Sequence, residues 1–177
     1  MAIKILQSEN AEYKSQIIAL YMEAFAQGAS EQYIDSIALD KYIEQLLKQG
    51  TVLLAIENEQ AVGALLSCLL TFDEYVTTAI TENFDIEKCV YVAEMMVAEQ
   101  ARGKGIGRQL LTAFFETPDI KHYSDAFIRV WDKNVGAIAL YQKMGFVPYT
   151  IIQQTKLKAD RSETFVMHKI YLHKKID

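Results

Sequence analysis

The stretch QARGKGIGRQLL, residues 100–111, decides the fold class of this chain. Between Arg102 and Arg108 it gathers three glycines and three cations, although the whole chain has only 8 glycines and a formal net charge of -5. An apolar run before it, CVYVAEMMV at 89–97, predicts a buried strand, and the apolar spacing after it predicts a helix to about Glu116. Strand, glycine turn and helix in this order can hold a phosphate group, because the first N–H groups of a helix have no partner within it.

Two familiar nucleotide motifs do not fit the glycine turn. A Walker loop requires G-x-x-x-x-G-K-[ST], which the chain does not contain. The dinucleotide fingerprint requires G-x-G-x-x-G, whereas Gly103, Gly105 and Gly107 are spaced one residue more tightly. The acidic residue expected about 20 positions later at the end of the next strand is also missing, since Asp125 lies at that strand's start. A helix start with incidental glycines remains the plain alternative.

Composition limits the class of protein. The 177 residues are enough for one domain, 1–177, with 51% hydrophobic and 23% charged residues. A pI of about 5.3 argues against a general nucleic-acid binder. The N-terminus MAIKILQSEN is too polar for a signal peptide, and the apolar run AVGALLSCLL is far shorter than the roughly 20 residues of a membrane span. We therefore expect a cytoplasmic protein with no membrane partner.

Cysteines and histidines do not indicate a metal site. Cys68 and Cys89 lie in apolar runs, which predicts two buried thiols in strands, and the three histidines form no cluster in the sequence. We expect no metal cofactor.

The order of predicted elements is that of a single α+β domain. Helices are expected from Asn10 to about Gln27, around 43–49 before Gly50, from the glycine turn to Glu116, and from Asn134 to Gly145. Strands are expected at 3–6, 51–57, 61–72, 89–97, 125–131, 146–153 and 163–172, with a turn at 58–60 that makes a hairpin. The polar, acidic segment 73–88 shows neither the apolar spacing of a helix nor that of a strand, so we expect it to be irregular.

A family resemblance fits the glycine turn. Arg102-x-x-Gly105-x-Gly107 matches the [RQ]-x-x-G-x-[GA] signature of the GNAT superfamily of N-acetyltransferases, and NVGAIALYQKMGF at 134–146 resembles that family's second block. The close resemblance covers about 91–148, and the first 50 residues agree only in element order. Many members carry a proline just after the strand, where this chain has Ala98-Glu99.

The resemblance implies a fold and a co-substrate. The fold is a mixed, mostly antiparallel sheet flanked by helices, with acetyl-CoA between two central parallel strands that splay apart, here 91–97 and 125–131. By analogy, Met96 and Val97 offer backbone contacts to pantetheine. The residues implied at the pyrophosphate are Arg102, Gly103, Lys104, Gly105, Ile106, Gly107 and Arg108. Asn134 either only caps its helix or also contacts the cofactor.

Acetyl transfer to a primary amine needs a group that removes a proton, because an ammonium ion with a pKa of about 10.4 has no lone pair. Glu94 is the candidate base, since it is the only charged residue in its strand. Burial would raise its pKa toward neutrality. The structural alternative is an ion pair with a nearby cation such as Arg129 on the adjacent predicted strand.

Tyr141 is the candidate acid for the departing thiolate. It shares a helix face with Ala137 and Met144, so a purely structural core tyrosine is the alternative. The resemblance to the family's second block favours the acid.

The acceptor is a small-molecule or peptide amine that the sequence does not identify. An acidic group in the irregular segment could form a negative rim that attracts amines or simply a solvated loop: Asp73, Glu74, Glu82, Asp85 and Glu87. Four tyrosines could line an acceptor pocket: Tyr33, Tyr42, Tyr75 and Tyr149.

Two alternatives to this function stay open. The chain could be a non-catalytic acyl-CoA-binding or regulatory module, or it could use a longer acyl-CoA. The C-terminal strand TFVMHKIYL, 164–172, is a candidate for pairing across a homodimer interface.

Overall fold

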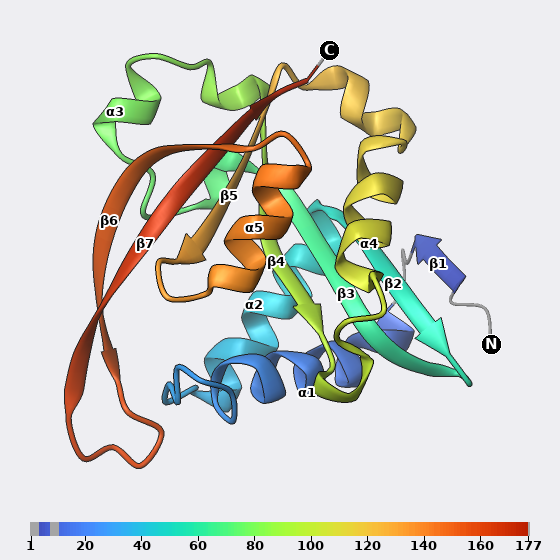
Figure 1. The fold of residues 1–177 in the computed structure, drawn as a ribbon, viewed down its shortest axis with the longest axis vertical. Coiled ribbons are helices and arrows are strands. Elements are labelled where there is room, and N and C mark those ends of the chain that lie inside the picture. Colours follow the sequence, from blue (N-terminus) through green and yellow to red (C-terminus); the bar gives the residue numbers. More distant parts are fainter. Residues whose placement is uncertain (1–3, 8–10, 177) are drawn as a thin grey trace.

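A seven-stranded mixed sheet runs through the protein in the order β1-β2-β3-β4-β5-β7-β6 (Figure 1). The computed structural model describes residues 4–7 and 11–176. Among the described strands, β4 and β5 are parallel and all other neighbouring pairs are antiparallel, which confirms the predicted sheet. The strands are β1 (Lys4–Gln7), β2 (Thr51–Glu57), β3 (Gln60–Leu69), β4 (Cys89–Val97), β5 (Asp125–Trp131), β6 (Val147–Leu157) and β7 (Thr164–Lys175).

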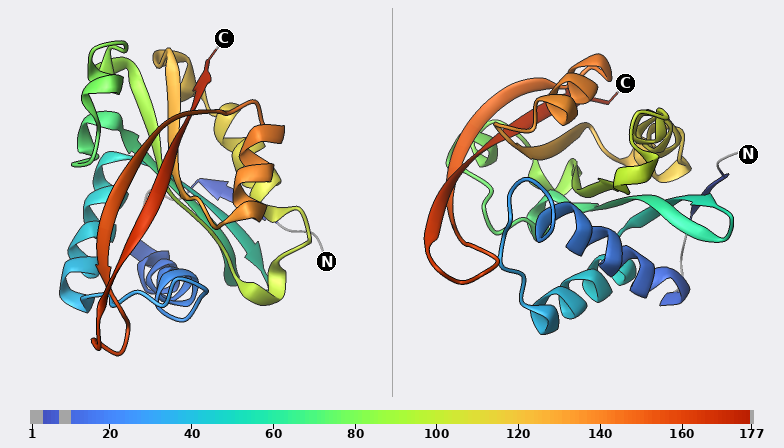
Figure 2. Two further views of the ribbon diagram at one scale, coloured as in Figure 1. Left: turned by 60° about the vertical axis from the view of Figure 1, so that its left-hand side comes forward. Right: turned by 60° about the horizontal axis from the view of Figure 1, so that its bottom comes forward.

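Helices cover both faces of the sheet. Helices α1 and α2 lie on one face and α4 and α5 on the other (Figure 2), so β3 and β4 at the centre are largely apolar on both faces, with Glu94 as the exception in β4. In β3, Ala64, Leu65 and Leu66 have no exposed surface. The helices are α1 (Lys14–Phe25), α2 (Ser36–Gln49), α3 (Thr78–Thr81), α4 (Ile106–Phe115) and α5 (Val135–Lys143).

Local capping explains where two of these helices begin. The Asp35 side chain accepts a hydrogen bond from Ala38 N at 2.8 Å and starts α2, which ends before Gly50 as predicted. The Asn134 side chain accepts from Ala137 N at 3.2 Å, which confirms it as the cap of α5.

Several predicted boundaries differ from the structure. Asn10, the expected cap of the first helix, lies outside the described residues, and α1 ends at Phe25. The strand expected to reach Phe72 ends at Leu69, because the chain turns there into a 3₁₀ helix. The segment 73–88 holds the one-turn helix α3, which is too short to show a period.

The last two strands form a long hairpin that reaches across the molecule. Its far end meets the connection between α1 and α2, where Tyr33 N donates to Leu157 O at 2.8 Å and Ala159 N donates to Glu31 O at 2.8 Å (Figure 2). The β6–β7 hairpin therefore forms a wall on the same side of the sheet as α2.

The sheet order corrects one expectation about a homodimer. The segment TFVMHKIYL lies in β7, which pairs with β5 on one side and with β6 on the other. Both edges of β7 are occupied, so the free edge at this end of the sheet belongs to β6.

None of the helices in the described part of the chain has the length and apolar character needed to cross a membrane.

Candidate active site

The two central parallel strands diverge. Cys89–Val92 pair with Asp125–Ile128, and no pairing continues beyond Val92 and Ile128 (Figure 1). A β-bulge explains the divergence, because Leu66 faces Glu94 whereas Ser67 faces Val92, which leaves Ala93 as an extra residue in β4. A bulge bends its strand and increases the local twist. This confirms the predicted splayed pair.

The register of β3 and β4 shows which backbone groups of β4 face the divergence. Ala98 N donates to Val62 O at 2.9 Å, and bonding alternates along an antiparallel pair, so Met96 opposite Ala64 is bonded to β3. Val97 and Met95 then direct their N–H and C=O groups away from β3, toward β5. Sequence reasoning named the neighbours Met96 and Val97, but two adjacent residues of a strand point their backbone groups in opposite directions. The period of two groups Val97 with Met95, but only the register of the two strands shows that this pair, and not Met96, faces β5.

The glycine turn carries a row of free backbone donors. Gly103 and Gly105 have φ angles of 78° and 76°, a region that side chains disfavour. A Cβ atom added at Gly103 would meet no atom within 4 Å, so the backbone there is open. No N–H group of residues 103–108 donates to another described residue. These donors surround the N-terminus of the ten-residue helix α4, an arrangement that binds anions.

The side chains of the turn are placed differently from one another. Arg102, Lys104 and Arg108 are exposed, whereas the Ile106 side chain is buried and can offer only its N–H group. Arg102 Nε donates to Val97 O at 3.2 Å, and Lys104 Nζ lies 3.5 Å from Glu57 Oε2. Within the described residues Arg108 has no such partner, so it is the cation best placed for a bound anion.

Gly107 allows close packing of three elements. A Cβ atom on it would lie 2.9 Å from Leu140 Cδ2 in α5 and 3.5 Å from Met95 Cε in β4. The third glycine of the motif therefore brings the start of α4 next to α5 and to the divergent end of β4.

Glu94 lies on the opposite face of β4, toward α2. Its carboxylate Oε1 accepts a hydrogen bond from Tyr42 OH at 2.9 Å. Burial raises the pKa of Glu94 to about 7, although the Tyr42 hydrogen bond and the positive charge of Lys169 both act to lower it. A carboxyl group with this pKa can gain or lose a proton near neutral pH.

The predicted alternative for Glu94, an ion pair with Arg129, does not form. Arg129 Nη1 instead donates to both carboxylate oxygens of Asp73, at 2.8 and 2.9 Å, and to Tyr171 OH at 2.9 Å. Asp73 is therefore buried and paired rather than part of a negative rim. Sequence reasoning missed this pair because the two residues are far apart along the chain.

The other acidic residues of that segment are exposed: Glu74, Glu82, Asp85 and Glu87. Of the four tyrosines considered for an acceptor pocket, Tyr42 contacts Glu94. Tyr33 accepts a hydrogen bond from Arg161, Tyr75 lies beside the Arg129 guanidinium, and Tyr149 donates to Ala79 O.

Tyr141 is buried in α5, where its ring packs against Phe146 with centroids 6.2 Å apart. Its pKa is raised well above the usual 10, first by burial and then by the negative charge of Glu94. Tyr141 and Glu94 are thus close enough to influence each other electrostatically, although they come from different elements. At neutral pH the Tyr141 hydroxyl keeps its proton.

Both cysteines are buried and free, in β3 and β4, as predicted. Burial raises the pKa of Cys68 and of Cys89 to about 12. Neither side chain therefore forms a thiolate near neutral pH. Residues 4–7 and 11–176 hold no group of three or more His, Cys, Asp or Glu side chains that could bind a metal ion.

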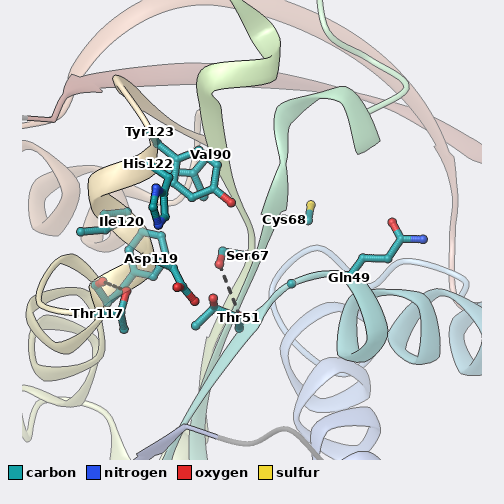
Figure 3. Close-up of a pocket in the computed structure, with 12 residues that line it drawn as sticks. Gln49, Thr51, Ser67, Cys68, Val90, Thr117, Asp119, Ile120, His122 and Tyr123 are labelled. Atoms are coloured by element: carbon teal, nitrogen blue, oxygen red, sulfur yellow. Dashed lines mark hydrogen bonds between the residues drawn. The ribbon is translucent and has the colours of Figure 1, made fainter.

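A separate cavity of about 240 Å³ lies at the far end of α4 (Figure 3). It is lined by residues that include Val90, Thr117, Asp119 and His122. The glycine turn lies at the N-terminal end of α4, whereas this cavity follows its C-terminal end. It is therefore not the place where a phosphate would meet the free N–H groups.

Three comparisons with known proteins agree with this geometry. Residues 48–148, more than half of the chain, match the model of the acetyltransferase (GNAT) domain. The uncharacterized N-acetyltransferase YobR of Bacillus subtilis (strain 168) is 31% identical over 77 residues, which are 44% of this chain but only 31% of YobR.

Solved structures resemble the whole chain. An N-acetyltransferase from Staphylococcus aureus Mu50 has a TM-score of 0.76 at 17% identity, with 100% of both chains covered. The protein yncA from Salmonella typhimurium, solved with its cofactor acetyl-CoA, has a TM-score of 0.73 at 18% identity, covering 100% of this chain and 95% of that one. At such identities these structures show a shared fold. The family model, which spans the splayed strands and the glycine turn, shows that the chain belongs to the GNAT family of acetyltransferases.

Proposed function

We propose that this protein transfers the acetyl group of acetyl-CoA to a primary amine of a small molecule or peptide, by direct attack within a ternary complex. The observation that carries the proposal is the edge of β4 that faces β5: its pairing with β5 ends at Val92, while β3 still holds its other edge, and β4 leads into unpaired N–H groups at 103–108. We also infer that residues 1–177 act as one domain, because strands from both ends of the chain share one sheet.

The turn fits a pyrophosphate. Backbone N–H groups from Gly103 to Arg108 donate to no described residue, and no side chain occupies the space beside Gly103. Arg108 and Arg102 add positive charge, whereas Lys104 shares its charge with Glu57. Ile106 and Gly107 contribute as backbone donors. The Asn134 side-chain nitrogen takes no part in capping α5, so it can donate to the same ligand.

The divergence of β4 and β5 fits an extended chain that carries amides. Val97 and Met95 direct backbone groups into it, so pantetheine amides can pair with β4 as an added strand would. We therefore replace the expected contact at Met96 by one at Met95 and keep the one at Val97.

Glu94 acts as the base in this proposal. A carboxyl group that is half deprotonated at about pH 7 can take a proton from the ammonium form of the acceptor, directly or through water, and the neutral amine then attacks the thioester carbonyl. Its position on the α2 face leaves the opposite face, with α4 and α5, for the thioester. Amine and thioester then meet between the splayed strands, and this orientation supplies much of the rate.

Tyr141 acts as the donor to the leaving sulfur. Because its pKa is raised above 10, it stays protonated throughout the working range. A thiol with a pKa of about 8.5 is a stronger acid than this phenol, so Tyr141 stabilises the thiolate by a hydrogen bond and full proton transfer is unfavourable.

Direct transfer is supported by the state of the two thiols. An acyl-enzyme on a cysteine would need a reactive thiolate, and burial, which raises the pKa of Cys68 and of Cys89 to about 12, disfavours that thiolate near neutral pH.

The test is release of free CoA thiol from acetyl-CoA in the presence of an amine panel, with mass spectrometry of the products. We expect thiol release that depends on an amine and an increase of 42 Da (one acetyl group, roughly) in that amine. Binding of acetyl-CoA without thiol release from any amine would instead assign the protein as an acyl-CoA-binding module.

A further inference from the structure

Two lysines of the β6–β7 hairpin stand on the same face of the sheet as Glu94. Lys169 is two residues from Tyr171 in β7, and Tyr171 OH donates to Asp73 on that face. Ile152 is the partner of Lys169 in β6, and Lys156 shares the face of Ile152 four residues later. Both lysines are partly buried, because the hairpin wall closes against the α1–α2 connection.

The charges of these lysines have no close partner. Neither Lys156 nor Lys169 forms a salt bridge or donates a hydrogen bond to any residue in the described ranges. Burial lowers the pKa of Lys169 to about 8, helped by the positive charges of Arg129 and Lys156. The positive charge of each lysine acts in turn to lower the pKa of Glu94, so the three side chains lie near one another.

The third cation of this region is already neutralised. Arg129 forms a salt bridge with Asp73 at 2.8 Å and lies against the rings of Tyr75 and Tyr171. With that pair set aside, Glu94 supplies one negative charge against the two lysines. The region therefore carries an excess of positive charge and can accommodate an anion.

The Gln154 side chain lies near both lysines in the β6–β7 register and lacks a hydrogen-bond partner for its amide oxygen. Gln154 lies two residues from Lys156 on the same face of β6, and its partner in β7, Met167, is two residues from Lys169. The Gln154 side chain is only 5% exposed, and its Oε1 has no hydrogen-bond partner among the described residues. A buried amide without a partner is unfavourable unless a ligand completes its hydrogen bonds.

We propose that the acceptor is an amine that also carries a carboxylate, an amino-acid-like small molecule whose carboxylate is bound by Lys156 and Lys169 and whose amine lies at Glu94. The proposal rests on the acetyltransferase function proposed above. Gln154 provides a further polar contact to the same molecule. The lysine pair therefore selects an acceptor that carries a negative charge beside its amine, whereas a negative rim would have favoured an acceptor with positive charge alone.

The first test compares matched acceptors. Amino acids and their carboxamides are incubated in pairs with acetyl-CoA, and acetylated products are quantified by mass spectrometry. We expect kcat/KM to be at least about tenfold higher for the carboxylate member, which corresponds to a difference of about 1.4 kcal/mol. The double variant K156M/K169M should lose this preference, whereas K175M, at an exposed lysine of the same strand, should keep it. A preference for the carboxamides, or one that survives in K156M/K169M, would overturn the proposal.

A second measurement does not need turnover. Saturation-transfer NMR on the protein–CoA complex would compare succinate with succinamide as probes. We expect succinate to bind and K156M/K169M to abolish its signal while CoA binding persists, which also shows that the variant is folded. Thiol release with simple amines but no succinate signal would refute the carboxylate site and leave the proposed function intact. Succinate binding without thiol release from any amine would support the carboxylate site and refute the proposed acetyltransferase function.

Discussion

At the scale of single residues, Glu94 and Tyr141 show how position sets the chemistry of ordinary side chains. Two effects oppose each other at Glu94: burial raises its pKa, and the hydrogen bond from Tyr42 lowers it. Burial has the larger effect. The negative charge of Glu94 and burial both keep Tyr141 protonated. The environment of Glu94 therefore lets its carboxyl group exchange a proton near neutral pH, whereas the environment of Tyr141 keeps its phenol protonated.

The pH dependence of turnover should follow Glu94. Because the base must be ionised, we expect kcat/KM for an acceptor without a carboxylate to rise with pH through about 7 and to level off above it. E94Q should remove this limb and reduce kcat/KM by roughly 10²- to 10⁴-fold. In Y42F the carboxylate loses a stabilising hydrogen bond, so its pKa rises and the limb moves to higher pH. A Y42F profile unchanged or moved to lower pH would contradict the assignment.

Tyr141 should contribute to kcat rather than to binding. We expect Y141F to lower kcat by about tenfold or more, since one hydrogen bond to a charged group contributes roughly 1.5–3 kcal/mol. The dissociation constant of CoA, measured by calorimetry, should change little. Unchanged turnover would leave Tyr141 as a core side chain that packs against Phe146.

At the scale of elements, the close approach of α4 to the sheet depends on a residue without a side chain. A Cβ atom on Gly63 in β3 would lie 2.9 Å from Ile106 Cγ2 and 3.2 Å from both Leu110 Cδ1 and Met96 O. The backbone oxygen cannot move away as a side chain could. Packing of Ile106 and Leu110 against Gly63 of β3 therefore positions the start of α4 and the glycine turn that precedes it.

Two glycine-to-alanine variants should change stability in opposite directions. G63A should destabilise the fold by about 1–3 kcal/mol through overpacking. In G136A, within α5, the added methyl would meet nothing within 4 Å, so we expect a gain of up to about 1 kcal/mol from helix propensity. Urea unfolding of both variants checks this. A G63A protein as stable as G136A would show that α4 does not pack as described.

At the scale of the whole molecule, the Asp73–Arg129 pair joins distant parts of the chain. It links the turn after β3 to β5, and Tyr171 OH donates to Asp73 from β7. The side chains of Arg129 and Asp73 are only 13% and 3% exposed. Removing one partner would leave the other charge buried without compensation, which is costly.

D73N should therefore destabilise the protein by about 3–5 kcal/mol. E44Q, which removes an exposed partner of Lys48, should leave the free energy of unfolding nearly unchanged. Denaturant unfolding of the two variants gives the comparison. Equal stability of D73N and the unaltered protein would mean that the buried pair does not hold β3, β5 and β7 together.

Sequence alone predicted the features that depend on local patterns. The apolar run of β4, the glycine turn, the Asn134 cap and the buried thiols all follow from neighbouring residues, and the structure confirms each of them. Features that depend on contacts between distant residues were not predicted. Asp73 meets Arg129 and Tyr42 meets Glu94 only because the fold brings α2, the turn after β3 and β5 to one place.

Two features that a single sequence does not contain explain most of the remaining differences between prediction and structure: strand register and the burial that the hairpin produces. The bulge at Ala93 is defined by the register of two strands, which no single-strand pattern contains, and the choice between Met95 and Met96 follows from that register. Of the two lysines on the Glu94 face, Lys169 lies in the strand expected at 163–172, whereas Lys156 lies beyond the strand expected at 146–153, which the structure extends to Leu157. Their partial burial becomes visible only when the β6–β7 hairpin closes against the α1–α2 connection.

The central claim is that the free N–H groups of the glycine turn bind the pyrophosphate of coenzyme A. Titration of ¹⁵N-labelled protein with CoA, followed by amide NMR, tests it most directly. We predict that the amide resonances of residues 103–108 shift the most, and that they shift less with pantetheine, which has no pyrophosphate. If CoA binds while the resonances of 103–108 stay in place and others move, the claim is contradicted.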